Sequence, residues 1–156
     1  TKHTTEGHRL RQDVYAAKES IATAATLPLR FWSGGVSRAE RNQQFENQFV
    51  VVIENSRHSN YFTEKLLDAI LAHCVPIYWG CPNIGDYFDP HGILEVKGGM
   101  DEVLKICAVL TSDDYHNRAE SIAKNALAAQ EYAGDFGLRV QRALVVALQN
   151  ESLDST

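Results

Sequence analysis

The residues best suited to chemistry lie in a polar loop that directly follows an apolar run. Glu54 and Asn55 begin this loop, Tyr61 ends it, and Glu64 and Lys65 follow in the first turn of the next predicted helix. The N-terminus of a helix attracts an anion such as phosphate, because it carries unpaired N–H groups and the positive end of the helix dipole. An ammonium in the first turn adds a positive charge at the same place. A neighbouring carboxylate repels phosphate but accepts hydrogen bonds from vicinal sugar hydroxyls. These residue types indicate a phosphate carried on a polyol, such as a nucleotide, although ordinary first-turn helix charges would show the same pattern.

The sequence around this loop predicts the elements that position it. Residues 49–53, FVVVI, are apolar and β-branched without alternation, which is typical of a strand buried on both faces in a parallel sheet. A helix should begin near Phe62 or Thr63, and residues 75–79, VPIYW, predict a second buried strand. We expect this β-loop-α-β unit to make a right-handed crossover. Because the loop directly follows the first strand, it should lie beyond the carboxyl ends of the strands, where α/β sheets bind ligands.

An ordered motif runs through the same stretch, with ENS at 54–56, YFTEKL at 61–66 and PIYWG at 76–80. It resembles the signature of the α1,3-fucosyltransferases of glycosyltransferase family 10, in their C-terminal, GDP-fucose-binding half. The resemblance implies an α/β fold, a Rossmann-like parallel sheet with flanking helices like the C-terminal half of a GT-B glycosyltransferase. The first strand of that sheet should lie just before Lys2, so we expect this chain to lack it.

The resemblance also implies roles for single residues. Arg11, Asn55, Tyr61 and Lys65 would hold the donor's diphosphate, and Glu64 would bind the ribose hydroxyls. Arg11 lies 44 positions before Asn55 in the local pattern LRQDVY, which matches a diphosphate-contacting arginine of the family. These cations and the helix N-terminus would stabilise the departing GDP without a bound metal or other cofactor. In the family the general base belongs to the N-terminal domain, so we expect no catalytic residue in this chain and no sugar transfer by it alone.

Other residues near the predicted site allow two interpretations. Tyr78 and Trp79 end the second strand and either line the nucleotide pocket or are core aromatics. Asn83 follows in a segment where a single helical turn is expected, and we count it as a further pocket residue. Arg38, in the polar stretch 36–47, either reaches a phosphate or is an exposed loop charge.

Helical and strand periodicity predicts the remaining elements. We expect an amphipathic helix over 9–25 with two arginines in its first turn, a short strand over 27–32 and a third strand over 92–96. Further helices are expected over 101–110 with Asp101 as N-cap, over 112–132 and over 138–149. In the helix over 112–132, the residues expected to face the core are Ala119, Ile122, Ala126 and Leu127.

Composition narrows the class of protein. The chain has 156 residues, 44% hydrophobic content and a net charge of −5, as expected for one globular domain without the basic stripe of a nucleic-acid binder. No apolar run approaches the ~20 residues of a membrane span. The three cysteines lack C-x-x-C spacing and the six histidines lack a paired carboxylate, so neither a disulfide framework nor a metal site is expected.

The sequence therefore predicts a nucleotide-sugar-binding domain over 1–150 and a frayed tail over 151–156. We expect an acceptor-binding N-terminal domain outside this chain, a glycan acceptor bound there, and a cytoplasmic location, or the Golgi lumen for an animal-type member. The predicted function is that of the donor-binding domain of an inverting glycosyltransferase that uses GDP-fucose. The alternatives are a non-catalytic nucleotide-binding module, the same half-fold with another sugar nucleotide, and a flavodoxin-like signalling domain.

Overall fold

A computed structural model describes residues 5–31 and 46–134 of the chain. Its described strands form one parallel sheet in the order β1-β2-β3, namely β1 (Phe49–Ile53), β2 (Val75–Trp79) and β3 (Leu94–Glu95). Phe49 lies opposite Val75 and Ile53 opposite Trp79. The predicted α/β class, the first two strands and their parallel pairing are confirmed. Arg38 and the helix expected over 138–149 lie outside the described residues.

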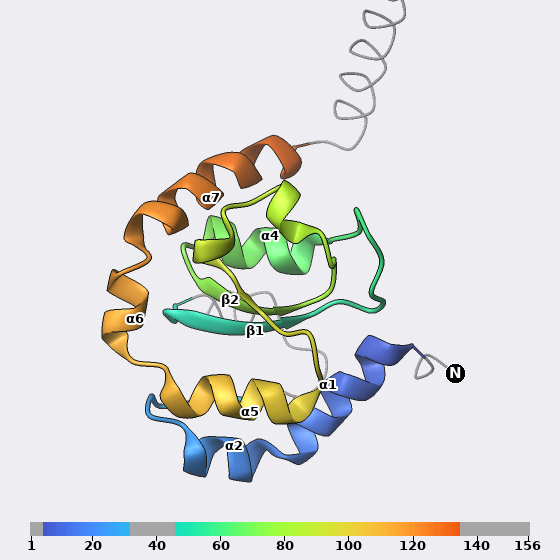
Figure 1. Cartoon of the computed structure of the whole chain (residues 1–156), viewed down its shortest axis with the longest axis vertical. Coiled ribbons are helices and arrows are strands. Elements are labelled where there is room, and N and C mark those ends of the chain that lie inside the picture. The colour runs from blue at the N-terminus through green and yellow to red at the C-terminus, as the bar shows by residue number, and fades with distance from the viewer. Residues whose placement is uncertain (1–4, 32–45, 135–156) are drawn as a thin grey trace, which may run out of the picture.

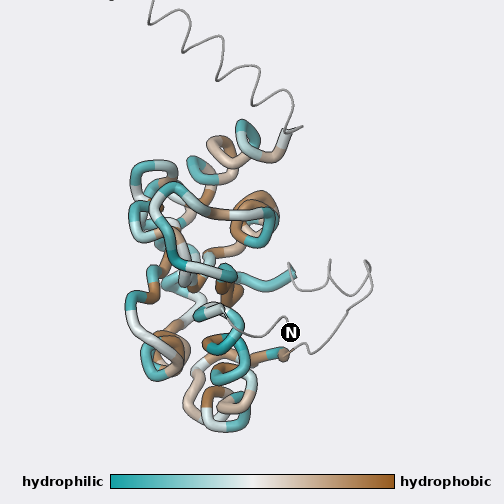
Figure 2. Tube along the Cα trace, turned by 90° about the vertical axis from the view of Figure 1, so that its right-hand side faces the viewer, coloured by the Kyte–Doolittle hydropathy of each residue, from teal (hydrophilic) through white to brown (hydrophobic). Residues whose placement is uncertain are grey.

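Helices cover both faces of this sheet (Figure 1). Leu66 and Ile70 of α4 and Ala129 of α7 belong to the core on one face, whereas Leu10 of α1, Ile21 of α2 and Val103 of α5 belong to the core on the other. The helices are α1 (Glu6–Ala16), α2 (Lys18–Ala24), α4 (Glu64–Leu71), α5 (Met100–Val109), α6 (Ser112–His116) and α7 (Ala119–Tyr132). In the turned view of Figure 2, apolar stretches lie at the centre, where the strands run, and in helices beside them.

The two long strands differ in burial. Every residue of β2 is buried, because β2 is the central strand and has helices over both faces. β1 has one described neighbour, and Val51 in its middle is 38% exposed. The prediction of a strand buried on both faces is therefore correct for β2 and wrong for β1. Sheet order decides this difference, and the apolar runs themselves do not reveal it.

Several element boundaries differ from the sequence prediction. The helix expected over 9–25 begins earlier, at Glu6, and a turn at Ala17 divides it into α1 and α2. Residues 27–31 form no strand, and β3 is shorter than predicted because a 3-10 helix, Pro90–Gly92, precedes it. The single turn expected after Asn83 is present as a 3-10 helix at Ile84–Asp86.

The C-terminal helices are also divided. Gly99, rather than Asp101, is the N-cap of α5, and the helix expected over 112–132 is interrupted between α6 and α7. The buried face of α7 also differs in part from the prediction. Ile122 and Ala126 are buried as predicted, whereas Leu127 is 69% exposed. Ala119 is exposed as well, and Ser121, Asn125 and Ala129 complete the buried face instead.

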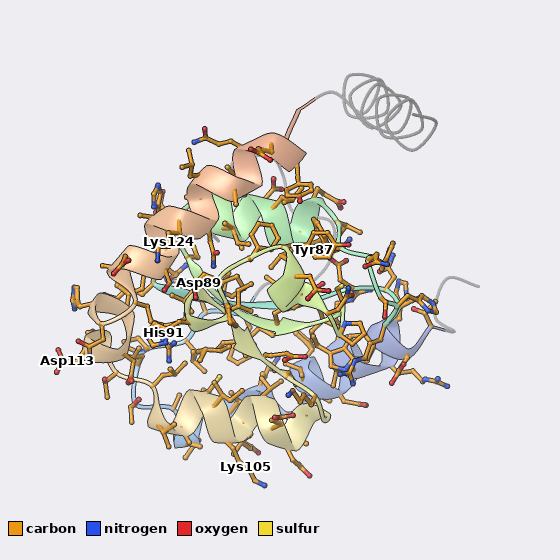
Figure 3. All side chains as sticks on the ribbon, turned by 45° about the horizontal axis from the view of Figure 1, so that its top comes forward. Tyr87, Asp89, His91, Lys105, Asp113 and Lys124 are labelled. Carbon is orange, nitrogen blue, oxygen red and sulfur yellow. The ribbon has the colours of Figure 1, made fainter. Side chains whose placement is uncertain are left out.

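An amide side chain joins α7 to the segment after β2. Asn125, which is 2% exposed, accepts from Asp89 N–H at 2.7 Å and donates to Asp89 C=O at 3.0 Å. Ser121 donates to the Asp89 carboxylate at 3.1 Å, and the Lys124 ammonium lies 3.9 Å from it. Figure 3 shows Asp89 beneath Lys124 of α7. This contact holds α7 against the loop that leads from β2 to β3.

Candidate functional site

The N-terminal part of α1 packs against the carboxyl end of β1. Gly7 N–H donates to Asn55 C=O at 3.2 Å. One helical turn later, the Arg11 guanidinium donates to Ile53 C=O at 2.6 Å and to Asn55 Oδ1 at 2.8 Å. Two of the predicted site residues, 44 positions apart in sequence, are therefore in direct contact. Arg11 lies in the second turn of α1 rather than the first, because the helix begins at Glu6.

Gly7 permits this close approach. A Cβ at this position would lie 1.7 Å from Glu54 O, 2.8 Å from Glu54 C and 2.9 Å from Asn55 O. All three are backbone atoms at the end of a buried strand, so they cannot turn aside as a flexible side chain would. The missing side chain at Gly7 thus sets the distance at which α1, and with it Arg11, docks onto the strand end.

Arg11 keeps its charge in this half-buried position. Desolvation lowers the pKa of its guanidinium and the nearby Glu54 carboxylate opposes that shift, so that the pKa lies below its ordinary value. Arginine remains protonated throughout the physiological range despite such a shift. Its side chain carries five N–H donors, and two hydrogen bonds fix its plane against the strand end. The remaining donors are suited to an anion, since the fork of a guanidinium matches the oxygens of a phosphate.

On the opposite face of the sheet, a fully buried carboxylate fixes the N-terminus of α4. Glu54 is 0% exposed, and its two oxygens accept from Thr63 N–H at 2.8 Å and from Thr63 Oγ1 at 2.7 Å. Thr63 is the N-cap of α4, and its hydroxyl oxygen accepts from Lys65 N–H at 3.4 Å. A buried charge is tolerated when it is hydrogen-bonded and paired. Glu54 therefore ties the start of α4 to the end of β1.

Lys65 lies between two carboxylates at this helix start. Its Nζ is 3.2 Å from Thr63 Oγ1, 3.2 Å from Glu64 Oε1 and 3.8 Å from Glu54 Oε2. The Lys65 side chain is 37% exposed and the Glu64 side chain is 71% exposed, so both reach solvent beyond the strand ends. Burial alone would raise the pKa of Glu64, but hydrogen bonds from its own backbone N–H and from Lys65, with the Lys65 charge, lower it overall. Glu64 is therefore ionised near neutral pH and can accept hydrogen bonds from hydroxyl groups.

The loop between β1 and α4 carries Tyr61 to this site. Tyr61 is half-buried, and its N–H donates to His58 C=O at 3.3 Å. Its ring meets the His58 ring edge-on, with centroids 6.4 Å apart. The structure thus places Asn55, Tyr61, Glu64 and Lys65 along one continuous segment after β1, and Arg11 of α1 contacts its start. In Figure 1 this segment leads from β1 to α4.

The structure places Tyr78 and Trp79 in the core. Their exposed fractions are 0% and 2%, and they lie in the clusters on opposite faces of the sheet. The Tyr78 hydroxyl accepts from Cys81 N–H at 3.0 Å, and desolvation raises the pKa of this phenol. Burial supports the interpretation of both residues as core aromatics rather than pocket residues.

Asn83 is half-buried at the start of the turn after β2, and its amide bonds to the loop that precedes α4. Its Oδ1 accepts from Asn60 N–H at 2.8 Å, and its Nδ2 donates to Asn60 Oδ1 at 2.7 Å. Asn83 is thus a partner of the loop backbone, a role that its position in the sequence does not reveal.

Sequence reasoning missed two residues of this arrangement. It placed Glu54 on the solvent-facing rim, but the carboxylate is buried and serves Thr63. The helix predicted over 9–25 left Gly7 outside it, although Gly7 is buried within α1. The sequence offered one signal, namely that Glu54 is the first residue of the ENS motif. That position does not indicate that the Glu54 carboxylate binds Thr63.

The described ranges 5–31 and 46–134 contain no group of three or more His, Cys, Asp or Glu side chains placed to hold a metal ion. Among the helices of these ranges, none combines the length and apolar character required to cross a bilayer.

Comparisons with known proteins identify relatives of this arrangement. Residues 32–118 match the profile of glycosyltransferase family 10 (fucosyltransferase), C-terminal region. The chain is 39% identical over 49 residues to an α-(1,3)-fucosyltransferase, FucT, of Helicobacter pylori, which covers 31% of the chain. It is 36% identical over 76 residues to an α-(1,4)-fucosyltransferase of Arabidopsis thaliana, which covers 44% of the chain.

Solved structures share the fold. A crystal structure of an α1,3-fucosyltransferase matches 74% of the chain with a TM-score of 0.53 and 21% identity, and a structure of such an enzyme with GDP-fucose matches equally well. The chain spans 10% and 19% of the two curated relatives, and 34% and 36% of the two solved chains. These matches confirm a Rossmann-like parallel sheet of the kind found in fucosyltransferases.

Proposed function

The chain belongs to glycosyltransferase family 10, and we propose that its described domain binds GDP-fucose as the donor half of an inverting fucosyltransferase. One observation supports this most directly. Two helices on opposite faces of the sheet bring a cation each, Arg11 and Lys65, to the carboxyl end of β1, where each contacts a residue of the same loop start. Paired cations beside a helix N-terminus suit a diphosphate.

The proposed contacts follow from this geometry. Arg11, with its plane set by Ile53 C=O and Asn55 Oδ1, offers its remaining N–H groups to the diphosphate. Lys65 and the positive dipole end of α4 would face the same anion from the other side of the sheet. Asn55 and Tyr61 add neutral donors from the loop, and Glu64 accepts hydrogen bonds from the ribose hydroxyls.

The same groups would act in the chemical step. When the glycosidic bond of the donor breaks, negative charge develops on the departing GDP. Fixed cations and a helix dipole stabilise that charge without reorganising, which is why we propose that no bound metal is required. Inversion further requires a general base that takes the proton of the acceptor hydroxyl. We assign that base, and the binding of the glycan acceptor, to a separate domain.

Calorimetric titration with GDP, ADP and UDP tests the proposal. Selective binding of GDP would support donor binding by this domain. Equal binding of all three nucleotides would reject specificity for GDP, and tighter binding of ADP or UDP would favour another sugar nucleotide. Absence of binding by a folded domain would overturn the proposal, and a non-catalytic relative of the fucosyltransferases would replace it.

A further inference from the structure

We propose that Asn60, Asn83 and Tyr87 form a clasp that holds the loop before α4 in its ligand-binding conformation. The inference rests on the proposed function, because it concerns how the loop that carries Asn55 and Tyr61 is prepared for a diphosphate. The three residues come from two segments, one before α4 and one after β2. None of them belongs to the proposed set of donor contacts.

In the clasp, Asn60 and Asn83 donate hydrogen bonds to each other, and the Tyr87 hydroxyl donates a third hydrogen bond to Asn60. Asn60 N–H donates to Asn83 Oδ1 at 2.8 Å, while Asn83 Nδ2 donates back to Asn60 Oδ1 at 2.7 Å. The Tyr87 hydroxyl donates to the same Asn60 Oδ1 at 2.7 Å. Both the backbone and the side chain of Asn60 are therefore held, so the clasp fixes the position and the orientation of this residue.

Asn60 is the point at which the loop turns. Its φ is 62°, in the left-handed region that asparagine adopts more readily than most residues. Tyr61, the next residue, leads directly into the N-terminus of α4. A change of backbone angles at Asn60 would redirect the Tyr61 side chain, because no other residue lies between them. The three hydrogen bonds thus act where the direction of Tyr61 is set.

The other side of the clasp is anchored to the core. The Tyr87 ring packs edge-on against Phe62 and Tyr132, with centroids 5.0 Å and 6.2 Å away. Asn83 also donates to Asp86 Oδ2 at 2.9 Å, and Cys81 Sγ donates to Asn83 Oδ1 at 3.0 Å, which fixes its amide plane. Figure 3 shows Tyr87 on the segment after β2, close to α4. An exposed loop is thereby tied to rigid elements.

The expected effect is a change in the fraction of molecules whose loop is ready to bind. A ligand that binds only the prepared conformation has an apparent affinity reduced by the population of that conformation. Loss of one or two hydrogen bonds in a solvent-exposed clasp would lower that population to about a tenth, and the affinity for GDP would fall about tenfold. The fold itself would be preserved in variants of Asn60 and Asn83, since neither residue belongs to either core.

The experiment compares Asn60→Gly and Asn83→Ala with the wild type and with Tyr132→Phe. Glycine tolerates the φ of Asn60, so Asn60→Gly removes the side-chain bonds without backbone strain. Tyr132→Phe removes a hydroxyl from the same aromatic cluster but from outside the clasp, and is the matched control. Hydrogen exchange of the Asn60 and Tyr61 amides, GDP affinity and melting temperature are measured for each protein.

The proposal predicts exchange at least tenfold faster at these amides in Asn83→Ala, and GDP affinity about tenfold weaker in both clasp variants. Melting temperatures and the control variant should match the wild type. Faster exchange with unchanged GDP affinity would show that the clasp holds the loop without affecting binding, and would overturn the proposal. Unchanged exchange would show that the clasp does not hold the loop, and would overturn it as well. A wild-type domain that binds no GDP would overturn the proposed function and this inference with it, whereas the exchange data would still report whether the clasp holds the loop.

Discussion

Gly7→Ala tests whether the docking of α1 sets the position of Arg11. The added Cβ would lie 1.7 Å from Glu54 O, and ordinary contact begins at 3.4 Å. The start of α1 must therefore retreat from the strand end by about the difference, because its neighbours at Glu54 and Asn55 are backbone atoms. The Gly7–Asn55 hydrogen bond, at 3.2 Å, cannot survive such a shift.

The magnitude follows from opposing terms. Overpacking of this kind costs about 1–3 kcal/mol, and the lost backbone hydrogen bond adds about 1 kcal/mol. Alanine favours a helix over glycine by about 1 kcal/mol, which offsets part of that cost. We therefore expect a net destabilisation of about 1–3 kcal/mol. Loss of the Arg11 contact with the diphosphate would weaken GDP binding by about 1.5–3 kcal/mol, or tenfold to a hundredfold.

Gly85→Ala is the matched control, because a Cβ at Gly85 would meet no atom within 4 Å. Thermal unfolding and calorimetric titration with GDP measure both quantities in the two variants. A Gly7→Ala protein with the melting temperature and GDP affinity of the wild type would refute the reasoning, since it would show that α1 can occupy its place without the close approach.

Four further predictions concern single side chains. Lys65→Ala should weaken GDP binding by about 1.5–3 kcal/mol, as measured by calorimetry, because a charge-assisted hydrogen bond is lost; an unchanged affinity would remove Lys65 from the site. Glu64→Ala should weaken the binding of GDP more than the binding of pyrophosphate, because only GDP has ribose hydroxyls that Glu64 can accept hydrogen bonds from. Pyrophosphate should lose little affinity, since the substitution also removes a carboxylate 3.2 Å from Lys65. Equal losses of affinity for both ligands would contradict this role. Asn125→Ala should lower stability by about 2 kcal/mol in denaturant titrations, because it leaves Asp89 N–H and C=O without their partner. Hydrogen bonds from His91 N–H and Ser121 and the Lys124 charge lower the pKa of Asp89, so its contribution to stability is present above its ordinary value of 3.8 and is lost as the pH falls further. Asp89→Asn should flatten the acid limb of the stability profile, and an unchanged acid limb would exclude this group.

Local patterns in the sequence predicted the elements whose burial is complete. The buried run at 75–79 and the helix start near Thr63 need no knowledge of distant residues, and both were predicted correctly. Val51 and Leu127 show where this approach fails. Val51 is exposed in a strand with one described neighbour, and Leu127 lies outside the face of α7 that packs against the rest of the fold. Both facts depend on how separate elements pack.

The candidate site divides in the same way. Asn55, Tyr61, Glu64 and Lys65 are close in sequence, so their types and order were sufficient to nominate them. The contact of Arg11 with Asn55 spans 44 positions, and only the family resemblance had nominated Arg11 as a site residue. Contacts between distant segments, such as Gly7 on Glu54 or Asn83 on Asn60, leave no periodic signal in either segment.

The most direct measurement of the central claim is an amide chemical-shift map of the domain during titration with GDP. We predict saturable shifts at Asn55, Tyr61 and the first turn of α4, with a smaller set in α1 around Arg11. Shifts confined to residues away from the carboxyl end of β1, or no shifts at saturating GDP, would contradict the assignment of the diphosphate to this strand end.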